Sequence, residues 1–484
     1  MSFFRLNDAY ALRSFTDRKP LVVLFGNPSG KWEVSADEMA LLQKCDGTTD
    51  INVNALTEKE TEFLKKMIGK KAVSEVNEPL PIKPNRAYRE YHHKRIAVAN
   101  WALTVRCNMN CLHCLNLSGS LTDHEPEITL EEAGTIIRKL ADYGVEAIEM
   151  FGGEPTVYGH FMEVVRMIYE AGMQINSIDT NGMLINDRML DEFDRIGASP
   201  IFAISFDGLG THEWMRNRKG CEETVKKAIR LCVDRGFRTN IGININKRTL
   251  PVLEKTIDYF KEMGCKRFKL LRTSESFRWV RTEAELGEQL TISTSDFAAI
   301  MVDLIRKYLP DIRAGLTFTV FNTVTIRPHS TGKSILNEIT TPPEHTSGWC
   351  PVGENGVFIG YKGHIAPCPG VESLLQVHGL YTDEINLLKR DLEEIVYGDF
   401  YRERFRITRA DIYNTSEECR KCSRWKECNG GICRMNATIA PECLAAGAPP
   451  EKVFFSNKDV VSCSLMKEGY LDRIAAILDG REET

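Results

Sequence analysis

Short apolar runs alternate with segments of helical apolar spacing between residues 96 and 275. Six of the apolar runs have the length of a strand: 96–105, 147–151, 175–180, 201–206, 240–246 and 267–271. Between them, segments such as 129–144 and 224–236 place apolar residues every three or four positions, as an amphipathic helix does. Six β-α units in succession predict an α/β fold with a parallel sheet, either open or partly closed as a barrel.

The chain before this region predicts a smaller α+β unit over residues 1–80. Its strand-like runs and helical segments lie at 21–25, 31–35, 36–47, 57–73 and 73–76. Ser35 is the expected N-cap of the first helix and Gly47 its expected C-cap. Residues 81–95 are rich in proline and charge, which is typical of a linker.

The chain after the α/β region changes character twice. Residues 276–345 have a helical pattern and are expected to bridge to a cysteine-rich region, 346–484. That last region contains short strand patterns such as 356–361. It ends in an apolar-periodic stretch, 464–478, which predicts one closing helix.

Composition and charge exclude some classes of protein and favour one compartment. The 484 residues carry 62 basic and 67 acidic side chains without a long run of one sign, which gives little support for nucleic-acid binding. No apolar run is long enough to cross a bilayer, and the first residues are too charged for a secretory signal. We therefore expect a cytoplasmic protein, in which the 15 cysteines serve as metal ligands and buried thiols rather than disulfides.

Polar or glycine-rich residues follow strand after strand of the predicted sheet. They are Cys107, Gly152–Pro155, Thr180–Gly182, Ser205–Gly208 and the asparagines Asn244 and Asn246. In parallel α/β sheets, chemistry is carried at the carboxyl ends of the strands. The pattern therefore predicts an active site at this end of the sheet.

Three cysteines, Cys107, Cys111 and Cys114, stand close together directly after the first strand. A cluster with four irons needs one outside ligand for each iron, so three thiolates leave one iron open. A three-cysteine zinc site is the alternative. With the sequence GGEP after the next strand, the CxxxCxxC spacing resembles that of the radical S-adenosylmethionine (SAM) enzymes. The resemblance implies a SAM-binding 4Fe-4S cluster and a 5′-deoxyadenosyl radical that takes hydrogen from a substrate.

The same resemblance implies roles for residues around the cluster. Gly152, Gly153 and Glu154 match the motif that receives the amino group of SAM, where the missing side chains would let the backbone approach the ligand. The residue before the third cysteine is usually aromatic and packs on adenine. Here it is His113, which can stack but adds a titratable group.

Three polar residues match the positions that hold the rest of SAM. Ser205 and Arg216 match the serine and arginine that bind the carboxylate and ribose, and Arg218 is a rival for the arginine role. Asn181 lies where the sequence TNG faces the cofactor. Taken alone, these residues could also be a helix cap, a turn or surface arginines.

The C-terminal cysteines resemble the SPASM domain of radical SAM enzymes, which holds two auxiliary 4Fe-4S clusters. The implied ligands of the first are Cys350, Cys368 and Cys433, and those of the second are Cys419, Cys422, Cys428 and Cys463. Cys443 is left over. Zinc is the alternative for the Cys419 and Cys422 pair.

Two departures from the family pattern bear on the substrate. The segment before Cys350 has no thiol, so either Cys443 or His345 completes the first auxiliary cluster or one iron is open. An open iron could bind a substrate thiolate, which would favour thioether chemistry. Sulfatase-maturing relatives carry an aspartate as general base after the second SPASM cysteine, whereas Cys368 is followed by Pro369.

Residues 1–80 resemble the RiPP recognition element, a small winged-helix domain that binds the leader of a ribosomally made peptide. The resemblance lies in the stretch SGKWEVSADEMALLQKCDGTTDI after a strand. In such domains the leader adds as an extra strand beside the third strand and packs against a helix. An ordinary capping domain and a DNA-binding winged helix are the alternatives, but the helix at 57–73 is mixed in charge.

Together these features predict a radical SAM peptide maturase with three 4Fe-4S clusters. Its partners would be a precursor peptide and an electron donor such as flavodoxin or ferredoxin, with no nucleic acid and no membrane. A thioether cross-link is favoured over a carbon–carbon link or epimerisation. The rival functions are radical chemistry on a folded protein or small molecule, and a non-catalytic cluster or zinc scaffold.

Overall fold

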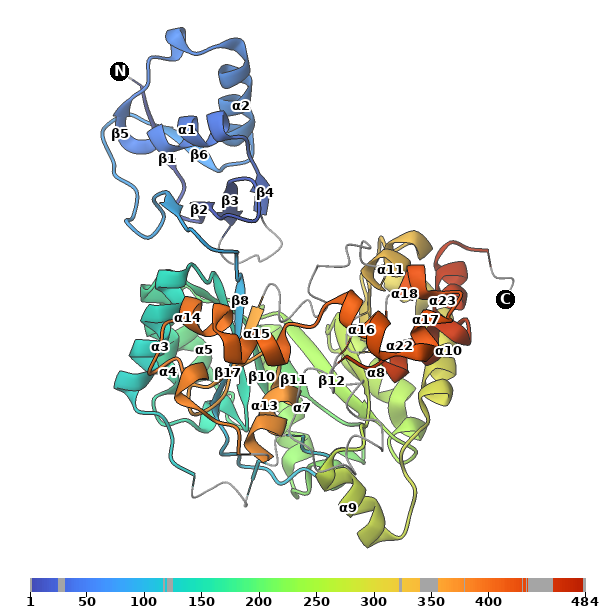
Figure 1. Cartoon of the computed structure of the whole chain (residues 1–484). Coiled ribbons are helices and arrows are strands. Elements are labelled where there is room, and N and C mark those ends of the chain that lie inside the picture. Colours follow the sequence, from blue (N-terminus) through green and yellow to red (C-terminus); the bar gives the residue numbers. More distant parts are fainter. Residues whose placement is uncertain are drawn as a thin grey trace.

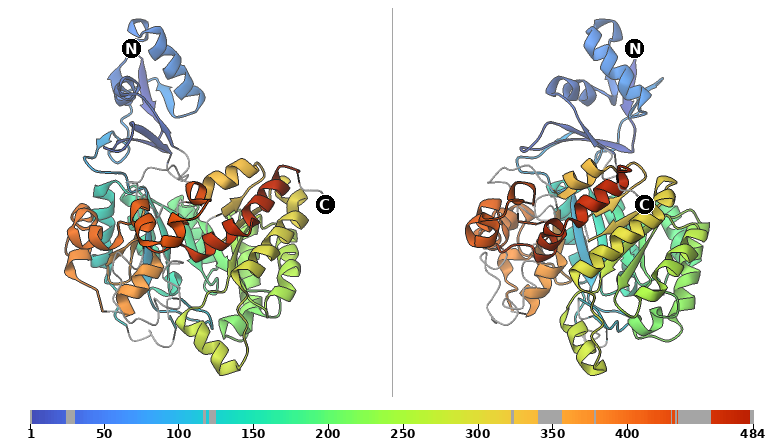
Figure 2. Two further views of the ribbon diagram at one scale, coloured as in Figure 1. Left: turned by 45° about the vertical axis from the view of Figure 1, so that its right-hand side comes forward. Right: turned by 90° about the vertical axis from the view of Figure 1, so that its right-hand side faces the viewer.

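The computed structural model has a small N-terminal unit that stands apart from a large α/β unit (Figure 1). The C-terminal helices lie across one side of the α/β unit (Figures 1 and 2). The structure describes residues 2–24, 31–115, 118–119, 125–321, 324–339, 356–377, 379–428, 430–431, 433 and 456–481.

A sheet of ten strands forms the centre of the α/β unit, in the order β15-β14-β13-β12-β11-β10-β9-β8-β16-β17. Six consecutive strands of this sheet are parallel and coincide with the apolar runs of the sequence: β8 (Val98–Thr104), β9 (Ala147–Gly152), β10 (Gln174–Thr180), β11 (Ile201–Ser205), β12 (Thr239–Ile245) and β13 (Arg267–Arg272). The predicted α/β fold, a partial (β/α)6 barrel, is therefore confirmed.

Helices follow these strands and cover the outside of the sheet (Figure 2). They are α3 (Leu130–Tyr143), α4 (Phe161–Glu170), α5 (Asp187–Ile196), α7 (Cys221–Asp234) and α8 (Leu253–Glu262). The limits of α3 follow from its ends: Thr129 accepts from the backbone N–H of Glu132, and Gly144 ends the helix at a φ of +89°. None of the described helices is both long and apolar enough to span a membrane.

The sheet extends beyond the six-unit barrel on both sides. The sequence predicts a helical pattern for segment 276–345, and the structure has strands there as well. The helices are α9 (Phe277–Leu286), α10 (Thr294–Arg313) and α11 (Gly332–Ile339), and the strands are β14 (Thr317–Val320) and β15 (Val324–Ile326). β14 pairs in parallel with β13, and β15 runs antiparallel to β14. On the other side, β16 (Gly356–Ile359) pairs in parallel with β8 and antiparallel with β17 (Ile365–Ala366).

The described part of the cysteine-rich region is mainly helical. Its described helices are α13 (Pro369–Val377), α14 (Leu392–Tyr397), α15 (Asp399–Phe405), α16 (Arg409–Thr415), α17 (Glu417–Arg420), α18 (Trp425–Cys428), α22 (Val460–Lys467) and α23 (Tyr470–Leu478). The prediction of one closing helix over 464–478 is wrong, because Gly469, at a φ of +72°, separates α22 from α23. Arg313 on α10 donates to the carbonyl oxygen of Leu478 at 2.6 Å and holds α23 against the barrel.

The N-terminal unit consists of small sheets and two helices with a core of their own. Its elements are β1 (Phe3–Leu6), β2 (Tyr10–Ser14), β3 (Leu21–Leu24), β4 (Lys31–Glu33), α1 (Ala36–Lys44), β5 (Asp46–Asp50), α2 (Glu58–Gly69) and β6 (Val73–Val76). Ser35 caps α1 as predicted, but the helix ends at Cys45. Gly47 lies within β5 at a φ of +80°, where an added Cβ would meet the carbonyl oxygen of Leu80 at 1.9 Å.

The predicted linker 81–95 is bound to both neighbouring units. Its strand β7 (Arg89–Glu90) pairs with β2 in the N-terminal unit. Arg86 donates to the carbonyl oxygen of Asp8 at 2.8 Å and, on the barrel side, to that of Gly172 at 3.0 Å. These bonds attach the N-terminal unit to the loop between α4 and β10.

Candidate functional site

A cavity of about 540 Å³ lies at the carboxyl ends of the parallel strands. Nine of the ten residues that the sequence assigns to SAM binding line it: Cys107, Cys111, Cys114, His113, Gly152, Gly153, Asn181, Ser205 and Arg216. They come from the loop after β8, the ends of β9 to β11 and the short helix α6 (His212–Arg216). The tenth residue, Glu154, does not line the cavity and is completely buried.

Gly152 and Gly153 are required by the packing of the chain itself. A Cβ added at Gly152, whose φ is +137°, would lie 2.2 Å from the carbonyl oxygen of Thr104, and one at Gly153 would lie 2.1 Å from that of Arg106. The two glycines thus let the end of β9 pack against the start of the cysteine loop. Backbone of the neighbouring segment fills the space that a side chain would need. Close approach of these glycines to a ligand stays a prediction.

Glu154, which lies just after β9 and outside the cavity, forms hydrogen bonds to the end of β10. Its carboxylate accepts from the backbone N–H of Asn181 at 2.6 Å and from the hydroxyls of Thr180 at 2.7 Å and Thr156 at 2.5 Å. Burial raises its pKa, while these hydrogen bonds oppose the rise. In this arrangement the side chain fixes the turn that carries Asn181, and its role toward an amino group remains a prediction.

Arg216 enters the cavity wall as half of a buried ion pair. Its Nε lies 2.6 Å from Oδ2 of Asp207, with both side chains almost completely buried, and its Nη1 lies 3.7 Å from Sγ of Cys111. Burial alone would raise the pKa of Asp207, but the charge of Arg216, together with the neighbouring histidines and the hydrogen bond from the backbone of Asn244, lowers this pKa overall. The rival Arg218 donates instead to the carbonyl oxygen of Asn108 and does not line the cavity.

His113 lines the cavity as a neutral ring. Burial lowers its pKa to about 4, so the imidazole carries no charge at neutral pH. Its Nδ1 is buried and has no hydrogen-bond partner among the described residues. An uncharged imidazole can stack on a flat heterocycle as an aromatic side chain does.

Helix α9 supports the cysteine loop from outside the barrel. Arg278 donates through Nη1 to the carbonyl oxygens of Cys111 at 3.3 Å and Ser118 at 2.8 Å. The hydroxyl of Thr282 donates to the carbonyl oxygen of Leu112 at 3.1 Å. The sequence predicts a helical pattern in this segment but does not reveal that it holds the loop.

We expect Arg278→Ala to lower reductive SAM cleavage by about tenfold or more, because the loop then loses two backbone hydrogen bonds. Arg281→Ala is the matched control, since Arg281 lies on the same helix and is exposed beside Glu285. The measurement is the rate of 5′-deoxyadenosine formation with dithionite, together with the electron paramagnetic resonance spectrum of the reduced cluster. Equal rates for the two variants would show that α9 does not support the loop.

The donor set of the cavity fits an iron–sulfur cluster. Three thiols, those of Cys107, Cys111 and Cys114, face one space, and Cys111 is the most buried of them. Within the described ranges, no three His, Cys, Asp or Glu side chains are close enough to share one metal ion. In a four-iron cluster each thiolate binds a different iron, so three thiols arranged around a cavity suit it.

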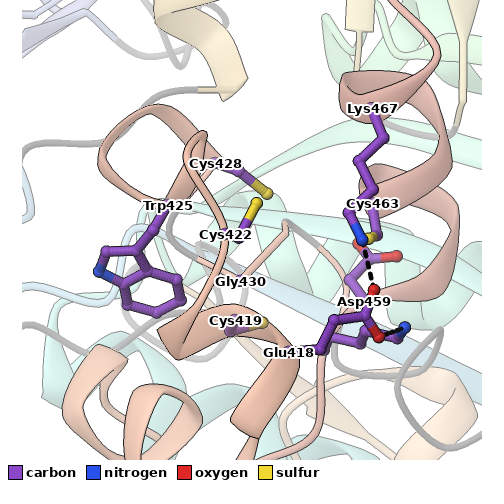
Figure 3. A pocket seen from close by; sticks show the side chains of 10 residues that line it. Glu418, Cys419, Cys422, Trp425, Cys428, Gly430, Asp459, Cys463 and Lys467 are labelled. Carbon is purple, nitrogen blue, oxygen red and sulfur yellow. Dashed lines mark hydrogen bonds and ion pairs between the residues drawn. The ribbon is translucent and has the colours of Figure 1, made fainter.

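A second group of cysteines surrounds a pocket between α17, α18 and α22. It is lined by Cys419, Cys422, Cys428 and Cys463, and Figure 3 shows that these side chains surround one space. Lys467 and Lys458 at its rim both pair with Glu418. Four thiols from three helices and a loop match the four irons of a cluster, as the sequence predicts for the second auxiliary site.

The first auxiliary site falls only partly within the described residues. Cys350 and Cys443 lie outside them, as does His345. Cys368 directly precedes α13, and the backbone N–H of Cys433 donates to Asp459 at 2.9 Å. Asp459 also caps α22, so Cys433 is held near the second cysteine group.

Six charged residues in or beside the site were not assigned a role from the sequence. They are Asp207, Arg278, Arg272, Glu149, Asp179 and Lys269. The last three face the cavity from β9, β10 and β13. Side chains on one face of a strand recur every two residues. Glu149, Asp179 and Lys269 each lie two residues before another residue of the cavity wall, so this alternation could have predicted them.

These features define an α/β protein with a radical SAM domain. Residues 101–263 match the family model described as the radical SAM superfamily. The match includes the second half of β8, all of β9 to β12, the three cysteines of the loop and Arg216.

Curated relatives share this domain but are matched over only part of their length. Fe-coproporphyrin III synthase of Methanosarcina barkeri is 30% identical over 166 residues, which are 34% of this chain and 41% of that protein. The subtilosin biosynthesis protein AlbA of Bacillus subtilis is 25% identical over 188 residues, 38% of this chain and 39% of that protein. The chain thus spans less than half the length of these relatives.

Among solved structures, Streptococcus suis SuiB has a similar fold over almost the whole chain. SuiB bound to S-adenosylmethionine matches with a TM-score of 0.60 and 15% identity, covering 95% of this chain and 100% of that chain. SuiB bound to its precursor peptide SuiA matches with a TM-score of 0.60, 14% identity and the same coverage. At this identity the likeness establishes the fold alone.

Proposed function

We propose that the chain is a radical SAM maturase that closes a cross-link, with a thioether favoured, in a ribosomally made precursor peptide. The observation that carries the proposal is one cavity that gathers three cysteine thiols with Asn181, Ser205 and Arg216 at the strand ends. The likenesses to AlbA, named for subtilosin biosynthesis, and to SuiB with a bound precursor peptide support it. The enzyme would act in the cytoplasm, where its thiols stay reduced.

In this proposal the residues of the chain hold and orient the reactants. Cys107, Cys111 and Cys114 would bind a 4Fe-4S cluster. When bound, this cluster and SAM supply a 5′-deoxyadenosyl radical that removes a hydrogen atom from the substrate. The Nε of Arg216 faces Asp207, and its buried Nη2 has no hydrogen-bond partner among the described residues. This Nη2 would donate a hydrogen bond to the carboxylate of SAM.

The C-terminal thiols would hold two auxiliary 4Fe-4S clusters, and a reduced flavodoxin or ferredoxin would be the electron donor. The preference for a thioether rests on the sequence before Cys350, which has no thiol and could leave an iron for a substrate thiolate. If Cys443 or His345 completes the first auxiliary cluster, no iron is left for a substrate thiolate and the preference for a thioether is weaker. A carbon–carbon link or epimerisation would then be the better alternative.

A sulfatase-maturase-like activity on a folded protein is less well supported. In that reaction the residue after the second SPASM cysteine serves as a general base. Here Pro369 follows Cys368 and lines the cavity. Proline has no titratable group, so another residue would have to take the proton.

The N-terminal unit offers an edge on which a leader peptide could add as a strand. β4 is the terminal strand of its sheet, in the order β4-β3-β2-β7. Trp32 on β4 packs edge-on against Tyr10, with the ammonium of Lys70 at 5.0 Å from its ring, so the end of α2 lies beside this edge. The indole Nε1 is buried and has no hydrogen-bond partner among the described residues. A free strand edge beside a helix is what strand augmentation requires.

We expect Trp32→Ala to weaken leader binding by about tenfold or more, because an aromatic side chain beside the docked strand would be a centre of binding energy. Ser74→Ala is the control, since Ser74 lies exposed on β6 in the other sheet. Fluorescence anisotropy of a labelled leader peptide with the full chain measures the affinity. The same loss in both variants, or none in either, would contradict docking at β4.

The function is tested by mass spectrometry of the short peptide encoded beside this gene after co-expression with the enzyme. The control is the same peptide with the Cys111→Ala variant. Loss of hydrogen pairs together with blocked thiol alkylation is the expected result and identifies a thioether. Loss with free thiols would identify a carbon–carbon link. An unchanged mass would leave epimerisation to be tested, by digestion of the peptide and chiral analysis of its amino acids. Unchanged stereochemistry in that analysis would refute the maturase proposal for this peptide.

A further inference from the structure

The walls of the barrel carry two layers of side chains around the cavity. Asn181, Ser205 and Asn244 belong to the layer at the strand ends, where the proposed function places SAM. Residues two positions earlier on a strand face the same side, about 6–7 Å deeper. Four side chains of this deeper layer line the cavity: Asn100, Glu149, Asp179 and Lys269. Ala203 and Gly242 are the small residues two positions before Ser205 and Asn244.

Three members of the deeper layer are ionisable, two acids and one lysine. Glu149 on β9, Asp179 on β10 and Lys269 on β13 all line the cavity. In the described part of the chain, neither carboxylate forms an ion pair within 4.0 Å with this lysine or another cation. Burial, and then the neighbouring Asp179, raise the pKa of Glu149, as expected for two carboxylates close together.

The other cations of the cavity wall are already balanced. Arg216 is paired with Asp207, and Arg272 donates to Glu275 at 2.8 Å and 2.7 Å. Lys269 is the remaining cation of the cavity wall, and in the described residues it has no carboxylate partner within 4.0 Å. Its charge opposes the effect of burial on the two acids, but the pKa of both Glu149 and Asp179 stays raised.

The small residues of the layer leave space between the acids and the lysine. A Cβ added at Gly242, which pairs with Lys269, would meet only the carbonyl oxygen of Ile204, at 3.9 Å. Another part of the wall also points to a ligand, because Arg216, 7% exposed, lines the same cavity with an Nη2 that has no hydrogen-bond partner among the described residues. The cavity thus has one wall suited to an anion and a deeper acidic wall.

We propose that Glu149 and Asp179 bind the positively charged side chain, lysine or arginine, of a residue in the core of the substrate peptide. The inference rests on the proposed function and adds the chemistry by which this cavity selects its substrate. A bound cation would stabilise the ionised form of both carboxyls, whose pKa burial raises. It would also place the neighbouring peptide bonds below the strand-end layer.

The test uses the full-length, cluster-loaded enzyme and the precursor peptide encoded beside its gene. In separate copies of the peptide, each lysine or arginine of the core is replaced by glutamine. The enzyme variants are Asp179→Asn, Glu149→Gln and the conservative Asp179→Glu, with Thr319→Val further along the sheet as the control. Mass spectrometry gives kcat and KM for each pair, and iron content verifies each protein.

One glutamine replacement is expected to lower kcat/KM of the wild-type enzyme about 30-fold or more, mainly through KM. On the natural peptide, Asp179→Asn and Glu149→Gln should each lower kcat/KM by a similar factor. On the peptide with that glutamine replacement, the same enzyme variants should lower kcat/KM by less than about threefold more. Asp179→Glu should retain most of the activity, and Thr319→Val should match wild type. Three results would overturn the inference while the peptide is still modified. The decreases in kcat/KM from the enzyme and peptide replacements could multiply, no glutamine replacement could lower kcat/KM, or the core could contain neither lysine nor arginine. A wild-type enzyme that leaves every peptide unmodified would overturn the proposed function and the inference with it.

Discussion

A Cys111→Ala enzyme is expected to form no detectable 5′-deoxyadenosine, a loss of at least about 1,000-fold. Cys111 is the most buried of the three loop cysteines, and its sulfur lies 3.7 Å from Nη1 of Arg216. Two thiolates cannot replace three as ligands of a four-iron cluster. The variant should therefore lack about four of the roughly twelve irons that three such clusters contain.

Iron analysis and chromatography of the anaerobic, dithionite-reduced reaction measure both effects. Cys232→Ala is the matched control, because Cys232 is also buried but lies on α7, outside the cavity. That control should keep its iron and its SAM cleavage. Normal 5′-deoxyadenosine formation by Cys111→Ala would exclude the loop as the cluster site.

The barrel could be predicted from the sequence because its strands are buried on at least one face and separated by amphipathic helices. Each run from 96–105 to 267–271 corresponds to an observed strand. The two strands of 276–345 were not predicted, since β14 and β15 are short and lie next to the long helix α10. Their pairing depends on the edge that β13 offers, which is a tertiary property.

The strand-end residues of the site could be predicted because the motifs specify them by spacing. Nine of them meet around one cavity. The spacing could not show that Asp207 balances Arg216 or that Arg278 holds the cysteine loop, because these partners are brought together only by folding. The spacing also could not show that Gly153 makes room for the backbone at Arg106, a contact that exists only in the folded chain.

Asp207→Asn is expected to destabilise the protein by about 3–5 kcal/mol, because it leaves the charge of Arg216 buried without a counter-charge. The amide cannot replace the carboxylate in either orientation. Oδ2 lies 2.6 Å from the Nε donor of Arg216, and Oδ1 accepts from the backbone N–H of Asn244 at 3.0 Å. An Asn side chain would present its NH₂ group to one of these two donors.

The loss should be constant across neutral pH. The pKa of Asp207 is lowered in the folded protein, so the stabilisation is complete above the ordinary carboxyl pKa of about 4 and disappears only as the pH falls below it. SAM binding should weaken by about tenfold or more as well, because the guanidinium loses the partner that orients it. Thermal unfolding from pH 5 to 8 and equilibrium dialysis with SAM measure the two effects.

The matched control is Asp258→Asn on α8, because Asp258 is 44% exposed in its pair with Lys261 and should contribute less than about 1 kcal/mol. Unchanged stability in Asp207→Asn would mean that water or a rearranged side chain neutralises Arg216. Lost stability with unchanged SAM affinity would separate the two roles. In that case Asp207 would hold α6 against the barrel, and Arg216 would reach its ligand without this support.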